Sequence, residues 1–166
     1  MALDPAVIRE AELTEERAQS AIVGITGHVF SAITLDVAAA LPLRRPVTRF
    51  RETVTSMVGL AGAYSGLLSL HCPQRLAIRI SACMLGAACS KVDADVRDAM
   101  GEMANMIGGD VKALFSPRGS GLSLSIPTVV YGSDYAIRSL SEADTLMLPF
   151  ACAGDEFLLS FRIRRS

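Results

Sequence analysis

The chain has 166 residues, of which 51% are hydrophobic, and its 16 basic and 17 acidic residues give a formal net charge of -1. This length and apolar content are sufficient for one domain with a substantial hydrophobic core. A net charge close to zero provides no electrostatic attraction for a polyanion, so nucleic acid is not an expected partner. We therefore predict a single domain over residues 1–166.

The four cysteines and two histidines have no spacing that is typical of a metal site. The sequence contains no CxxC pair, and His28 and His71 lie far apart. The cysteines stand in apolar runs, which favours buried, reduced thiols: Cys72, Cys83, Cys89 and Cys152. We expect neither a metal site nor a cofactor bound by this chain. The N-terminus lacks a basic segment followed by an apolar one, so we expect a cytoplasmic protein.

The N-terminal third begins with a clear helix signal. Thr14 is followed by Glu15 and Glu16, an N-cap with acids in the first turn, and a helix is predicted over residues 14–31. The segment Ile33–Leu43 is compatible with either a strand or a helix. Four arginines then follow, and we interpret them as part of a solvated loop rather than a binding surface: Arg44, Arg45, Arg49 and Arg51.

The middle of the chain carries an uncharged stretch at residues 53–74 that is long enough to raise the question of a membrane span. Serines, glycines and a tyrosine interrupt it, which favours a buried β-hairpin instead. We predict strands at Thr53–Ala61 and Gly66–Cys72 around a turn at Ala63–Gly66. A helix should follow from Pro73, with Gly86 just past its end.

The C-terminal half is predicted to contain a third helix over Asp95–Lys112 and then three strands. The strand-like runs are Leu122–Tyr131, Thr145–Ala151 and Glu156–Ile163, and a hairpin turn joins the last two. Consecutive strands with short turns favour antiparallel pairing. The sequence therefore predicts an α+β fold with a mostly antiparallel sheet and packed helices.

The third helix has two different faces. Apolar residues at steps of three and four form one buried stripe: Val96, Met100, Met103, Ile107, Val111 and Leu114. Glu102 and Asn105 lie on nearly the opposite side and point the same way, in a row with Asp98. Glycines cost a helix about 1 kcal/mol each relative to alanine, yet three lie close to this row: Gly101, Gly108 and Gly109.

We interpret these glycines as clearance that lets another surface approach the helix backbone beside Glu102 and Asn105. Two other interpretations remain open. The polar pair could belong to an ordinary solvated face, and the glycines could serve the internal packing of two helices.

The pattern D-x-x-G-E-x-x-N-x-x-G, carried by Asp98, Gly101, Glu102, Asn105 and Gly108, resembles the signature helix of the CheC/CheX/FliY chemotaxis phosphatases. The resemblance extends over most of the chain from about Thr53. It includes the hairpin Met57–His71, the helix from Pro73, the run Leu124–Val129 and the hairpin Leu148–Phe157. CheC proteins carry two such motifs and this chain carries one, so it is most similar to the CheX type.

The resemblance implies an enzyme that removes the phosphoryl group from the aspartyl phosphate of a CheY-like response regulator. Asn105 would orient the attacking water, and Glu102 would pair with the active-site lysine of the regulator. Asp98, Gly101, Gly108 and Gly109 would contact the partner, which holds its own Mg²⁺. A homodimer formed through the sheets and no membrane insertion are also implied.

Two non-enzymatic hypotheses remain. The same helix face could serve a non-catalytic adaptor that binds a response regulator or another signalling domain. It could also be buried against another subunit, which would make the chain an assembly component.

Overall fold

The computed structural model describes residues 3–34, 36, 38–42, 45–116, 121–138 and 145–166. Within these residues the helices are α1 (Pro5–Glu10), α2 (Glu15–Thr34), α3 (Gln74–Leu85) and α4 (Ala94–Leu114). The strands are β1 (Ala39–Ala40), β2 (Arg49–Ala61), β3 (Tyr64–Pro73), β4 (Ser123–Leu124), β5 (Thr128–Ala136), β6 (Leu146–Cys152) and β7 (Asp155–Arg165).

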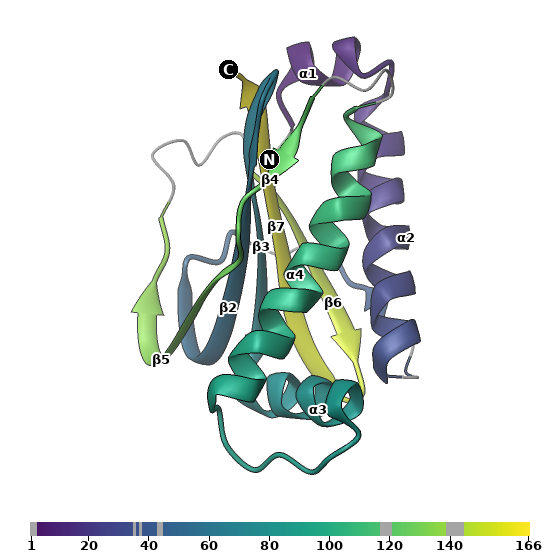
Figure 1. Cartoon of the computed structure of the whole chain (residues 1–166). Coiled ribbons are helices and arrows are strands. Elements are labelled where there is room, and N and C mark those ends of the chain that lie inside the picture. Colours follow the sequence, from purple (N-terminus) through teal and green to yellow (C-terminus); the bar gives the residue numbers. More distant parts are fainter. Residues whose placement is uncertain (1–2, 35, 37, 43–44, 117–120, 139–144) are drawn as a thin grey trace.

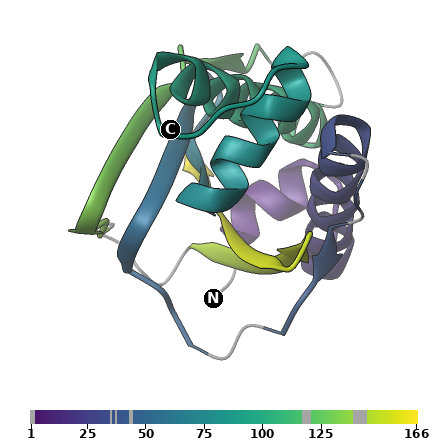
Figure 2. The same ribbon diagram turned by 90° about the horizontal axis from the view of Figure 1, so that it is seen from below.

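The strands form one antiparallel sheet in the order β1-β6-β7-β3-β2-β4, and β5 also pairs with β2. Both β4 and β5 can pair with β2 because this strand is long. β5 pairs along its first part, and β4 pairs with its last two residues. Helices α2, α3 and α4 lie on one face of the sheet (Figure 1), and the view in Figure 2 separates the two layers. The predicted α+β fold is confirmed.

The β2–β3 hairpin is confirmed, but its turn is shorter than predicted. Tyr64 is already in β3, where it pairs with Arg165 and is buried, so the turn consists of Gly62 and Ala63. Gly62 has a φ of 139°, and a Cβ atom there would lie 2.5 Å from the carbonyl oxygen of Gly121. Only glycine fits this turn without displacing the neighbouring backbone.

The segment Ile33–Leu43 divides between two elements. Helix α2 continues to Thr34, three residues past the prediction, and the two residues of β1 pair with β6. The hydroxyl of Thr34 donates to the carbonyl of Phe30 at 2.8 Å, which satisfies this buried polar group inside the helix. The short helix α1, capped by Asp4, was not predicted.

Helix α3 begins after Pro73 and ends at Leu85, and Gly86, with a φ of 65°, forms the left-handed cap that the sequence predicted. The expectation of four buried cysteines is wrong in part. Cys72 and Cys152 are buried, Cys89 is half-buried and Cys83 is exposed. Cys83 lies off the buried side of α3, which is formed by Leu76, Ala77, Ile80 and Ser81.

The predicted strand Leu122–Tyr131 is divided into β4 and β5 by the segment Ser125–Pro127. Pro127 has no N–H group to donate to a sheet ladder, which is consistent with the interruption at this point. β5 then continues to Ala136. No helix in the described part of the chain is long and apolar enough to span a membrane.

A candidate functional site on helix α4

Helix α4 crosses the helical face of the sheet next to β2 (Figure 1). Its N-terminus is capped by Asp93, whose side chain accepts a hydrogen bond from the backbone N–H of Val96 at 3.1 Å. Asp95 in the first turn and Lys112 in the last turn both complement the helix dipole. The predicted apolar stripe is buried except at its end, where Leu114 is half-buried.

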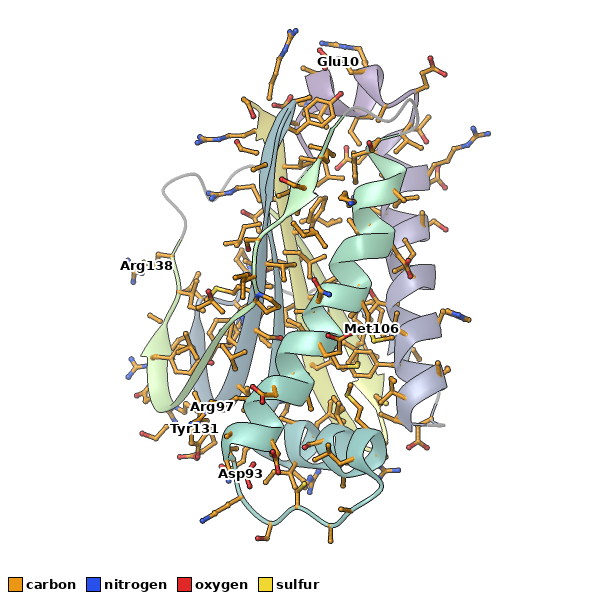
Figure 3. All side chains as sticks on the ribbon, viewed as in Figure 1. Glu10, Asp93, Arg97, Met106, Tyr131 and Arg138 are labelled. Atoms are coloured by element: carbon orange, nitrogen blue, oxygen red, sulfur yellow. The ribbon has the colours of Figure 1, made fainter. Side chains whose placement is uncertain are left out.

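The predicted polar pair lies on the side of α4 that faces solvent. Glu102 and Asp98 are exposed and Asn105 is half-buried. Within the described residues, neither Glu102 nor Asn105 makes a side-chain hydrogen bond or an ion pair. Figure 3 marks the neighbouring Met106 at the middle of the helix and Asp93 at its N-terminal end. The carboxylate and the amide are therefore available to a partner.

Gly101 and Gly108 do not lie on this exposed face, so the structure does not support their interpretation as clearance for a partner. Both are buried. A Cβ atom at Gly101 would lie 3.4 Å from Cβ of Pro127, and one at Gly108 would lie 2.7 Å from Cγ2 of Val58. These glycines let α4 approach the sheet, so the packing is internal, against strands rather than against a second helix.

Gly109 differs from its neighbour. A Cβ atom added there would have no atom within 4 Å, and the residue is half-buried. Gly109 is thus the one glycine of the three that leaves open space on the side of Glu102 and Asn105. A role for Asp98 and Gly109 in partner contact remains a proposal.

The contrast between the two adjacent glycines leads to a stability prediction. Gly108→Ala should lower the free energy of unfolding by about 1–2 kcal/mol, because overpacking against the buried, stiff Val58 outweighs the gain in helix propensity. Gly109→Ala should raise it by about 0.5–1 kcal/mol, since helix propensity alone changes. Urea denaturation of both variants measures the difference. Shifts of the same sign would contradict this account.

The chemistry available on α4 is limited to positioning and charge. A carboxamide donates and accepts hydrogen bonds but does not exchange a proton near neutral pH, and Glu102 supplies one negative charge. Among the described residues no group of three or more His, Cys, Asp or Glu side chains could hold a metal ion.

A cavity of about 150 Å³ lies on the opposite face of the sheet, away from α4. His71 borders it and is buried, with its Nδ1 atom 2.8 Å from Thr55 Oγ1 and its Nε2 atom 3.1 Å from Ser160 Oγ. Its ring is stacked on Phe50, with ring centroids 4.2 Å apart. Burial lowers the pKa of His71 to about 4. This cavity is distinct from the candidate site on α4.

The arginine cluster is only partly described, because Arg44 lies outside the described residues. Arg49 donates to the carboxylate of Asp134 across β2 and β5, with Nε 2.8 Å from Oδ1. This contact raises the pKa of Arg49 and lowers that of Asp134. Arg49 is therefore part of a strand pair rather than of the predicted loop.

Two features of the structure were not found from the sequence. One is the segment Ser125–Pro127, which runs beside α4, and the other is the burial of His71. Pro127 is a local signal for the break in the strand, but nothing local indicates which helix the segment would meet.

Comparison with known proteins identifies the family and the fold of this chain. Residues 54–151 match the family model described as chemotaxis phosphatase CheX. The structure of CheX from Desulfovibrio desulfuricans has a TM-score of 0.77 and 24% identity, with 89% of this chain and 99% of that chain covered. CheX from Vibrio vulnificus has a TM-score of 0.76 and 21% identity over the same shares.

A third similar structure is the CheX–CheY–BeF3–Mg²⁺ complex from Borrelia burgdorferi. It has a TM-score of 0.73 and 18% identity, with 89% of this chain and 98% of that chain covered. At these identities the structures establish a shared fold. No curated protein matches the chain. Because the family model spans more than half of the sequence, the chain belongs to the CheX family of chemotaxis phosphatases.

Proposed function

We propose that this chain accelerates hydrolysis of the aspartyl phosphate on the receiver domain of a CheY-like response regulator. The observation that carries the proposal is the position of Glu102 and Asn105, which share the solvent-facing side of a long helix capped by Asp93. Membership of the CheX family and the likeness to a CheX that was solved with CheY support it.

Asn105 would act by positioning. Phosphoryl transfer needs an attacking water in line with the bond that breaks and stabilisation of the charge on the phosphoryl oxygens. The receiver domain would supply Mg²⁺ and a lysine, which stabilise the charge on the phosphoryl oxygens. This chain would then supply a hydrogen-bond donor and acceptor that hold the attacking water. The short side chain of Asn105, half-buried on a helix, has few rotamers to lose when it engages this water.

Glu102 would contribute to docking. Its carboxylate lies one turn before Asn105 on the same side of α4 and is exposed. An ion pair between Glu102 and the regulator's lysine would be shielded from water in the complex, where it is stronger than at a free surface. This pair would orient the helix so that Asn105 enters the active site of the receiver.

The proposal is tested with the stand-alone receiver domains of the host, each phosphorylated by a small phosphodonor. Substoichiometric amounts of this protein should accelerate phosphate release from at least one of them, over repeated turnovers, with Mg²⁺ present. Saturable binding to a phosphorylated receiver without faster phosphate release would instead identify an adaptor. If every receiver domain keeps its intrinsic rate, the proposed activity is overturned.

A further inference from the structure

The segment Ser125–Pro127 runs directly beside Asn105. Pro127 is the neighbour of Gly101, and Leu124 is a neighbour of Gly108, with its Cδ2 atom 3.6 Å from a Cβ placed there. Asn105 follows Gly101 by four residues and precedes Gly108 by three, so it is adjacent to both on the helix surface, where the packed side borders the exposed side. The residues between Leu124 and Pro127 must therefore pass alongside Asn105.

This segment is held at both ends. The N–H of Ser125 donates to the carbonyl of Gly59 at 2.9 Å, and the N–H of Gly59 donates to Ser125 Oγ at 2.8 Å. At the other end Pro127 packs against α4 at Gly101. A proline also restricts the residue before it to extended backbone conformations. The backbone of Ile126 is thus fixed on either side.

The side chain of Ile126 is nevertheless exposed to solvent. It is 88% exposed, and the next most exposed large apolar residue among the described ones, Leu85, is 53% exposed. A single exposed apolar residue is common on protein surfaces. Ile126 differs because its backbone is anchored by its neighbours and because it flanks the proposed site.

We propose that Ile126 is a docking residue that inserts into an apolar patch beside the phosphoaspartate site of the receiver domain. This inference rests on the proposed function. Charge complementarity argues for this occupant, since the exposed carboxylates of Asp98 and Glu102 stand on the adjacent helix face, and a receiver active site presents Mg²⁺ and a lysine. Ile126 would add the desolvated apolar contact that such a polar surface lacks.

The test compares Ile126→Ser with Val130→Ser. Val130 is 36% exposed, and it pairs with Thr55, whose hydroxyl meets His71 on the sheet face opposite α4, so it is a matched apolar residue away from the site. Binding to the beryllium fluoride form of the receiver is measured with Mg²⁺, together with steady-state phosphate release. Ile126→Ser should raise Kd and KM about tenfold and leave kcat unchanged. Val130→Ser should change Kd less than twofold.

Each other outcome overturns the proposal in a recognisable way. Wild-type affinity in Ile126→Ser rejects Ile126 as a docking residue, while phosphatase activity of the wild-type protein keeps the proposed function. Loss of a dimer in Ile126→Ser, seen by light scattering without a change in receiver affinity, would show that a second copy covers this residue. If the wild-type protein neither binds nor dephosphorylates any receiver, the proposed function fails first, and this inference fails with it.

Discussion

Replacing Asn105 with alanine is expected to lower the rate constant for dephosphorylation of the bound regulator by about 100-fold or more, because the water would no longer be held in line. The fold should be retained, since Asn105 is half-buried on a helix surface and alanine is the better helix former. Single-turnover phosphate release at saturating enzyme measures this rate constant directly. Thermal unfolding of the variant shows whether its structure is intact.

Two further variants sharpen this test. Asn105→Asp keeps the size of the side chain but removes the N–H donors and adds a negative charge next to a phosphoryl group, so it should be as inactive as Asn105→Ala. Asp110→Asn alters an exposed residue on another side of the same helix and should keep wild-type activity. Wild-type dephosphorylation rates in both Asn105 variants would contradict the proposed mechanism.

The stability of the protein is expected to fall in mild acid because of His71. Burial lowers the pKa of this side chain from 6.5 to about 4, so the native state holds the neutral imidazole. Between these two pKa values the unfolded chain binds a proton that the native chain does not. The contribution of His71 to stability is therefore complete above about pH 6.5 and is lost as the pH falls toward 4.

A pKa difference of about 2.5 corresponds to a loss of about 3 kcal/mol in the free energy of unfolding. Urea denaturation at pH 7, 5.5 and 4 measures the change. Carboxylates also titrate toward pH 4, so the informative quantity is the difference between wild type and His71→Gln. This variant should be less stable at pH 7, and the gap should narrow as the pH falls. A constant gap at all pH values would contradict the assigned pKa.

Helix α4 shows which features the local sequence can predict. Its predicted limits, Asp95–Lys112, differ from the observed Ala94–Leu114 by one or two residues, because the apolar period of the helix and the Asp93 cap are both local features. The same period placed Glu102 and Asn105 on the face away from the core. The pairing of the last two strands was predictable for a similar reason, since the turn that joins them is short.

The glycines of α4 show what the local sequence cannot predict. Gly101, Gly108 and Gly109 look alike in the sequence, yet two of them are buried against Pro127 and Val58 and one faces open space. Val58 lies fifty residues before Gly108, so no pattern within the helix could indicate the contact. Which glycines serve packing was decided when the helix and the sheet came together.

The sequence by itself determined the α+β class, the extent of the long helices, the exposed side of α4 and the resemblance to the CheX family, because periodicity, caps and motifs are all short-range. The tertiary structure alone decided that Ser125–Pro127 flanks Asn105, that Ile126 is left uncovered there, and that His71 is buried with Phe50, Thr55 and Ser160. These features depend on which strands pair and which helix covers them. Long-range packing determines both the strand pairing and the helix that covers it. The local sequence around these residues does not indicate which residues they contact.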